Sequence, residues 1–303
     1  MVWSERTGTR SSTEIAVTSG ATRAPPGPFR TGGVRSRTAG PQPAPARLPV
    51  GRPSVGVVDV APTVQRLPAP GGRVGPLWVV TRGEGRPLVL LHGNGEDHHV
   101  FDRMVEPLGA GRLLVGLDSR SHGRSPRGAG PLRIAAMADD VAAVLDRLGL
   151  AHADVLGFSD GGNVALELAV RHPDRVDRLV VVGANLFPEG LTMRALVEVQ
   201  LAHAVVASVA RLVPPLRGPA ERLALMVDDP SIDPADLALV TAPTLVVVGE
   251  RDVVRPEHTR LIVDALPDAR LAVVPRAGHL LPVCAPDRLA ALVVDFLAQA
   301  PAR

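Results

Sequence analysis

From about residue 77 onward, short runs of aliphatic and β-branched residues alternate with longer amphipathic stretches. This alternation predicts an α/β fold, in which helices cover both faces of a parallel β-sheet. Most of the apolar runs are continuous, as expected for strands that are buried on both sides. The predicted strands cover residues 77–81, 87–91, 113–117, 153–157, 179–183, 244–249 and 270–274. Between them, apolar residues at spacings of three and four predict helices at 134–148, 162–171, 256–265 and 286–298.

One long interval, about 186–242, contains no strand pattern. It holds two helical stretches instead, LTMRALVEVQLAHAVVASVARLV and PAERLALMVDD, with PPLRGP between them. Helices inserted between two strands of a parallel sheet, at the edge where the strands end, can cover a site and shape its pocket. We therefore expect a short helical lid here.

The first 60 residues have a different composition. They are rich in Arg, Pro, Gly, Ser and Thr, contain few large apolar side chains, and show neither a two-residue nor a 3.6-residue period. Such a segment cannot bury enough apolar surface to offset the entropy of ordering it, so we predict a disordered tail over 1–60 and one folded domain over 61–303. Three interpretations of the tail stay open: a solvated extension or misassigned start, an organellar targeting segment, and a weak polyanion-binding arm.

The charge balance argues against a nucleic-acid partner. The tail carries eight Arg against three acidic residues, whereas the rest carries 25 Arg against 28 acidic residues. A nucleic-acid-binding domain needs basic residues clustered on its folded surface. There is no window of 18 uncharged apolar residues and no signal-peptide pattern, and a single Cys284 cannot form an internal disulfide. We expect a cytoplasmic protein with a small-molecule substrate and no nucleic-acid or membrane partner.

A candidate nucleophile lies in the stretch VLGFSDGGNVALELAV, where a predicted strand meets a predicted helix. Ser159 is the centre of a G-x-S-x-G pattern, with Gly157 and Gly161 two residues to either side. A sharp strand-to-helix turn strains the serine backbone and exposes its Oγ, and side chains at the two flanking positions would collide. The helix N-terminus that follows favours developing negative charge.

A nucleophilic serine needs a base, and the base needs a group that orients it. Asp252 lies just beyond the predicted strand at 244–249, in GERD, and His279 lies just beyond the strand at 270–274, in PRAGHLLP. The order Ser, Asp, His, each past a successive core strand, is the order of an α/β-hydrolase triad. Glu250 is the rival acid, two residues before Asp252.

The stretch HGNGEDHHVFD, after the strand at 87–91, can present backbone N–H groups to an oxyanion. We assign the N–H of Asn94 and the N–H of Asp160 to this oxyanion hole. The side chains predicted to contact substrate are His98, Phe101, Phe158 and Phe187.

Histidine and aspartate residues nearby raise a metal-dependent alternative. They comprise His92, Asp97, His98 and His99 in this turn, with Asp118 and His122 after the next strand. In an extended segment His98 and His99 would point apart, and no His-x-His or H-E-x-x-H spacing occurs. We predict no metal site, and expect His92, Asp118 and His122 to form hydrogen bonds within their loops.

Five stretches together resemble the α/β-hydrolase superfamily, in its esterase, peroxidase and lactonase-like branch: LVLLHGNGEDHHVFD, VGLDSRSHGRS, VLGFSDGGNVALELAVRHPDRVDRLVVVGAN, APTLVVVGERDVVRPEHT and PRAGHLLP. The resemblance covers roughly residues 77–299. It implies an eight-stranded, mostly parallel sheet, a triad of Ser159, Asp252 and His279, and no cofactor. Ser121 departs from the family, whose members usually have glycine there.

The elbow G-x-S-D-G-G is similar to that of the biphenyl-hydrolase-like subgroup. A carboxylate beside the nucleophile would favour a substrate with a nearby cation, such as an amino ester; alternatively, Asp160 complements the helix dipole. The resulting hypothesis is a serine hydrolase that acts on small or medium ester-like substrates through an acyl-enzyme. A cofactor-free perhydrolase of haloperoxidase type and a carbon–carbon bond hydrolase use the same triad, and a non-catalytic ligand receptor is the alternative of another class.

Overall fold

A computed structural model of the chain describes residues 71–299. The predicted disordered tail at 1–60 lies outside the described residues, so this prediction and the domain boundary at residue 60 stay predictions. Eight strands are present in 71–299: β1 (Gly72–Val74), β2 (Leu77–Gly83), β3 (Arg86–Leu91), β4 (Arg112–Asp118), β5 (Ala153–Phe158), β6 (Val176–Val182), β7 (Thr244–Arg251) and β8 (Ala269–Gly278).

All eight strands form one sheet, in the order β1-β2-β4-β3-β5-β6-β7-β8. The pairs β1–β2 and β2–β4 are antiparallel, and every other neighbouring pair is parallel. All seven predicted strands are confirmed, with ends that differ by at most four residues. The sequence did not predict β1, because its three residues contain a single buried side chain, Val74.

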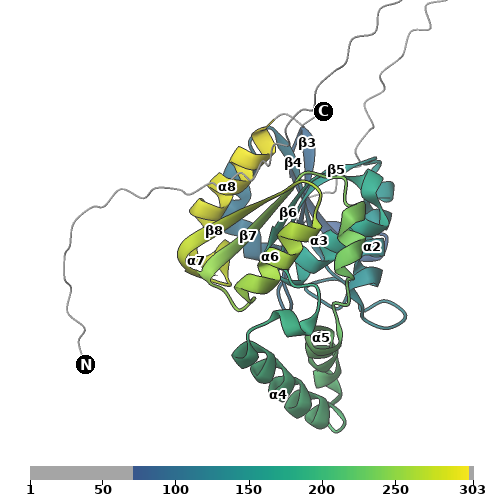
Figure 1. The fold of residues 1–303 in the computed structure, drawn as a ribbon. Helices are drawn as coiled ribbons and strands as arrows, with labels where there is room; N and C mark the ends of the chain where they lie inside the picture. Colours follow the sequence, from purple (N-terminus) through teal and green to yellow (C-terminus); the bar gives the residue numbers. More distant parts are fainter. Residues whose placement is uncertain (1–70, 300–303) are drawn as a thin grey trace, which may run out of the picture. The chain divides into compact units, whose positions relative to one another are not determined.

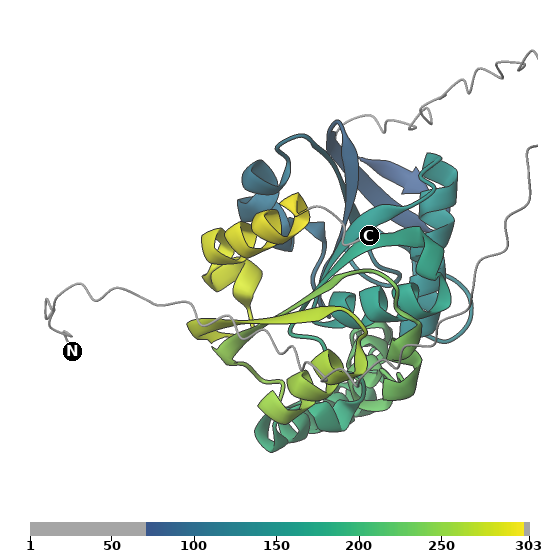
Figure 2. The same ribbon diagram turned by 45° about the horizontal axis from the view of Figure 1, so that its top comes forward.

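Helices cover both faces of the sheet (Figures 1 and 2). One face carries α2 (Ile134–Leu148), α3 (Asp160–Arg171) and α6 (Pro256–Ala265). The other carries the 3₁₀-helix η1 (His98–Met104), α1 (Val105–Leu108), α7 (Leu281–Cys284) and α8 (Pro286–Ala298). The fold is therefore the predicted eight-stranded α/β arrangement.

The central strands contribute side chains to two separate cores. In β3, Val89 and Leu91 belong to the core beneath α2 and α3, whereas Leu88 and Leu90 belong to the core beneath α1 and α8. Successive side chains of a strand point to opposite faces, so a strand buried on both faces must be apolar at every position. The continuous apolar runs in the sequence have this cause.

α3 begins at Asp160, two residues before its predicted start. Gly161 and Gly162 have low helix propensity, which placed the predicted boundary after them. Tertiary packing overrides that preference, because a Cβ on Gly161 would lie 2.1 Å from the carbonyl oxygen of Leu91. Only glycine allows the first turn of α3 to approach β3 this closely.

The interval between β6 and β7 forms the predicted helical lid, which lies beyond the strand ends (Figure 1). It consists of η3 (Pro188–Gly190), α4 (Met193–Ala210), η4 (Pro214–Leu216), α5 (Arg217–Asp228) and η5 (Pro234–Leu239). Within 71–299, α4 is the one helix that could cross a membrane by length and composition alone. Only Ala195 and Ala210 of its 18 residues are buried.

Candidate active site

Ser159 lies at a sharp turn between β5 and α3. Its backbone adopts φ 53° and ψ −121°, a conformation that side-chain-bearing residues rarely take. A Cβ on Gly157 would lie 2.1 Å from the carbonyl oxygen of Gly161, so the flanking glycine is sterically required. The Ser159 N–H donates to the carbonyl of Val182 at 2.7 Å and holds the turn against β6.

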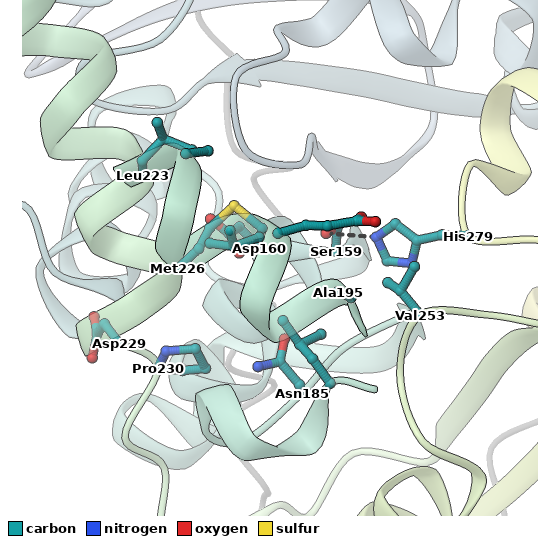
Figure 3. Close-up of a pocket in the computed structure, with 14 residues that line it drawn as sticks. Ser159, Asp160, Asn185, Ala195, Leu223, Met226, Asp229, Pro230, Val253 and His279 are labelled. Atoms are coloured by element: carbon teal, nitrogen blue, oxygen red, sulfur yellow. Dashed lines mark hydrogen bonds between the residues drawn. The ribbon is translucent and has the colours of Figure 1, made fainter. Parts of the chain in front are cut away.

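Ser159, His279 and Asp252 form a continuous hydrogen-bonded line (Figure 3 shows its Ser159–His279 bond). The distance from Ser159 Oγ to His279 Nε2 is 2.9 Å, and that from His279 Nδ1 to Asp252 Oδ1 is 2.7 Å. An ionised carboxylate only accepts, so Nδ1 carries the proton and Nε2 is left to accept from the serine hydroxyl. Burial opposes ionisation of Asp252, but hydrogen bonds from His279 and from the backbone N–H groups of Val254 and Gly249 hold its pKa below the ordinary value.

The rival acid, Glu250, is engaged elsewhere. Its side-chain carboxylate accepts the backbone N–H of Arg276 at 2.5 Å, and the residue is exposed. Asp252 is the carboxylate that contacts His279, because β7 ends in a turn in which the Asp252 carboxylate accepts the N–H of Gly249.

Gly183, directly after β6, is a site residue that sequence reasoning missed. Its φ is 61°, and a Cβ there would lie 2.8 Å from Cε1 and 2.9 Å from Nδ1 of His279. A larger residue would therefore displace the imidazole. The signal available in the sequence is a glycine at the end of the strand next to the one that precedes Ser159.

The two residues that carry the predicted oxyanion donors are joined through their side chains. Asp160 is the first residue of α3, so its N–H has no acceptor inside the helix. The side-chain amide of Asn94 donates to Oδ2 of Asp160 at 2.9 Å, which joins the two loops. His92 stabilises the Asn94 turn as expected: Nδ1 donates to the carbonyl of Gly93 at 2.7 Å, and Nε2 accepts the N–H of Ser119 at 3.0 Å.

Two carboxyl groups lie close to the nucleophile. Burial raises the pKa of Asp160 to about 6, against the opposing effect of the Asn94 hydrogen bond. Glu96, which sequence reasoning also missed, accepts the N–H of Gly93 at 3.0 Å, and burial raises its pKa too. The ideal Cβ position of Gly93 lies 2.9 Å from Oε2 of Glu96 and 3.1 Å from Cβ of Ser159, which places this carboxyl beside the elbow.

The lid is tied to these loops through Arg222 of α5. Its guanidinium donates to the carbonyl of Ser121 at 2.9 Å, and its own carbonyl accepts from the Asn94 side chain at 2.8 Å. Ser121 has φ 66°, so it adopts the left-handed conformation that a glycine would take without strain.

A cavity of about 320 Å³ opens above Ser159 and His279, between the strand ends and the lid (Figure 3). Its apolar walls include Leu191, Val199, Leu223 and Met226, and its polar walls include Asp160, Glu198 and Asp229. Within residues 71–299, no arginine side chain lines it. The site is therefore mainly apolar, with an acidic polar component.

None of the four predicted substrate-contacting side chains lines this cavity, so the structure corrects that prediction. Phe101 and Phe158 are fully buried in the core beneath α1 and α8. Phe187 packs against the ring of His258 instead, edge-on at 4.6 Å between centroids. In a chain with so few aromatic residues, these rings serve packing, and smaller aliphatic residues of the lid form the cavity.

His98 is held outside the cavity by Asp118, whose Oδ1 lies 2.6 Å from the imidazole Nδ1. Burial opposes ionisation of Asp118, but hydrogen bonds from His98 and from the N–H of Arg124 lower its pKa to about 2. Contrary to the sequence expectation, the rings of His98 and His99 do not diverge: they lie 4.1 Å apart, because this segment is a 3₁₀-helix rather than extended. Asp97, His98 and His99 are close enough to share a cation, but the imidazoles are already paired with carboxylates.

Known proteins are similar to this chain in sequence and fold. The profile of the alpha/beta hydrolase fold matches residues 86–203. A pimeloyl-(acyl-carrier protein) methyl ester esterase from Neisseria meningitidis serogroup B is 32% identical over 244 residues, which cover 70% of this chain and 93% of that protein. The chain belongs to the α/β-hydrolase family.

Other proteins similar to this α/β-hydrolase are also hydrolases. A 2-hydroxymuconate semialdehyde hydrolase from Pseudomonas putida is 31% identical, over 73% of this chain and 90% of that protein. The crystal structure of a hydrolase from Pseudomonas aeruginosa has a TM-score of 0.62 and 27% identity, and the match covers 74% of this chain and 94% of the other. This α/β-hydrolase is thus an enzyme of the ester-hydrolase type.

Proposed function

We propose that this α/β-hydrolase is a serine esterase in which Ser159 is the nucleophile, His279 the general base and Asp252 the group that orients it. The observation that carries the proposal is the hydrogen-bonded line from Ser159 Oγ through the imidazole to Asp252, with contacts of 2.9 Å and 2.7 Å. A serine at its ordinary pKa becomes nucleophilic only when a base accepts its proton. The strained elbow at Ser159 supports the same assignment.

The reaction follows from these positions. His279 Nε2 takes the Ser159 proton as Oγ attacks the ester carbonyl, and the N–H groups of Asn94 and Asp160 stabilise the oxyanion. The imidazolium then gives its proton to the leaving alcohol, and an acyl-enzyme remains. Water, deprotonated by His279, attacks the acyl carbonyl and releases the acid. Asp252 keeps the imidazole in the required tautomer and stabilises its charged form.

The cavity suggests the substrate class. A volume of about 320 Å³ is at the small end of ligand pockets, which favours small or medium esters. The carboxyl groups of Asp160, Glu198 and Asp229 offer no counter-charge to an anionic substrate. We therefore expect neutral esters, or esters of amines and amino acids, to be preferred over anionic half-esters.

Two alternatives retain the same triad. A carbon–carbon bond hydrolase is favoured by the similarity to the 2-hydroxymuconate semialdehyde hydrolase, and a perhydrolase would differ only in the nucleophile that attacks the acyl-enzyme. A non-catalytic receptor is disfavoured by the alignment of Ser159 with His279. The predicted cytoplasmic location stays a prediction.

The test is a panel of p-nitrophenyl esters and lactones, with neutral and anionic members of equal length. Ser159→Ala should abolish turnover and labelling by a fluorophosphonate, since no other group supplies the acyl acceptor. Ser208→Ala is the matched control, because that hydroxyl is exposed on α4 and donates only to the carbonyl of Ala204. Turnover by Ser159→Ala at the wild-type rate would overturn the assignment.

A further inference from the structure

The outer side of the lid helix α4 is an exposed apolar stripe. Met193, Val197, Leu201 and Val205 follow one another at intervals of four residues and are 73%, 42%, 62% and 62% exposed. Residues four apart lie on one side of a helix. Leu212, 87% exposed, continues the stripe into the turn after α4. Large apolar side chains gathered in this way on a surface mark an interaction site.

The opposite side of α4 faces the cavity. Ala195, Val199 and Ala202 line it, and α4 lies on the outer edge of the lid (Figure 1). The helix α4 therefore lies between the cavity above Ser159 and the surroundings. A surface that binds the stripe would lie directly beside the substrate cavity.

The charges at the stripe are predominantly positive. Arg194 is neutralised by Glu198 of the same helix, at 2.8 Å. Arg211 and Arg217 bracket the apolar turn 212–216, are exposed, and form no ion pair with any residue in 71–299. An exposed apolar helix face with unpaired arginines beside it is complementary to an anionic bilayer, whose acyl chains can take the apolar side chains and whose phosphates can take the arginines.

Contrary to the expectation from the sequence of no membrane partner, we propose that α4 and the turn 211–217, which we call the lid edge, dock on the surface of an anionic lipid bilayer. The helix lies in the plane of the interface, with its apolar stripe among the acyl chains and Arg211 and Arg217 at the lipid phosphates. It does not span the bilayer, because its other side forms the cavity wall. The occupant is lipid, because an anionic bilayer offers acyl chains to the exposed stripe and phosphates to Arg211 and Arg217.

Vesicle sedimentation with the full chain tests the docking. Wild type is expected to bind vesicles of phosphatidylcholine and phosphatidylglycerol, and to bind pure phosphatidylcholine more weakly. Leu201→Gln combined with Leu212→Gln should weaken partitioning by at least about 10-fold, because the apolar contribution is lost. Arg211→Gln combined with Arg217→Gln should weaken binding to the anionic vesicles by about 30-fold and leave pure phosphatidylcholine unaffected.

The matched control is Leu271→Gln with Val273→Gln, two exposed apolar residues of β8 that lie outside the lid. The control should bind like wild type, and turnover of p-nitrophenyl acetate should be unchanged in all variants, since none of these residues lines the cavity. A failure of vesicle binding can therefore be told apart from a failure of the proposed esterase activity, because turnover is measured on the same variants.

Three results would overturn the proposal. They are no binding of wild type to the anionic vesicles, equal binding by the Leu201/Leu212 variant, and conversion of a dimer to a monomer by that variant without any effect on lipid. The second would show that vesicle binding does not use the apolar stripe. The third would show that a second copy covers the stripe.

Discussion

Gly183 lies against the imidazole of His279, so closely that a Cβ at that position would come within 2.8 Å of the ring. The contact arises because β6 and β8 flank β7 in the sheet. The ends of β6 and β8 therefore lie on either side of the turn after β7 that carries Asp252. The position of the base is thus determined by a residue that has no side chain.

Gly183→Ala should lower kcat by about 100-fold, the scale expected when a catalytic group moves by about 1 Å. Gly128→Ala is the control, because Gly128 has a similar φ of 71° but no atom within 4 Å of the added Cβ. Both variants should lose about 1 kcal/mol of unfolding free energy from backbone strain. Steady-state kinetics and urea unfolding measure the two effects, and equal kcat values for the two variants would contradict the steric role of Gly183.

Asp252→Asn should reduce kcat by about 10³- to 10⁴-fold, because an amide in place of the carboxylate favours the wrong imidazole tautomer. Glu250→Gln should stay within about threefold of wild type, since its carboxylate bonds the Arg276 N–H instead. If the two losses were reversed, Glu250 would be the triad acid.

Asp160→Asn should change the pH dependence of stability. Because the folded-state pKa is raised from 3.8 to about 6, the folded chain holds a proton that the unfolded chain loses between about pH 4 and pH 6. The wild-type unfolding free energy therefore falls with rising pH in this window, and the variant lacks this loss. The variant should equal wild type near pH 4 and exceed it by roughly 2 to 3 kcal/mol at pH 7.

Urea unfolding of both proteins from pH 4 to pH 8 measures this difference, in which the other titrating groups cancel. Parallel curves would show that Asp160 does not titrate in this range. The backbone N–H at position 160 is retained in the variant, so esterase activity at pH 7 should persist.

Val199→Trp should shorten the acyl chains that the site accepts. Val199 faces the cavity, so the larger ring should lower kcat/KM for p-nitrophenyl octanoate by at least about 10-fold, while the acetate is affected less. Val197→Trp is the control, because that side chain lies on the outer stripe of α4. A loss of octanoate activity in both variants would contradict the role of Val199 as a cavity wall.

The sequence alone determined the order of the seven longer strands and of the main helices between them, the elbow at Ser159, and the presence of Asp252 and His279 beyond later strands. These features are local: apolar runs reflect burial on both faces, and the glycines around Ser159 are required within one turn of chain. Since parallel strands all end at one edge of the sheet, chain order was enough to predict that these three residues meet.

Only the tertiary structure decided which groups surround them. Whether Asp252 or Glu250 contacts His279 depends on the direction in which each side chain leaves the end of β7. Two residues of sequence spacing do not encode that direction. Glu96 and Gly183 reach the site through the packing of loops after different strands. Phe101 was expected at the substrate and lies in the core instead, because a residue's apolar character indicates that it is buried but not which of several apolar environments it enters.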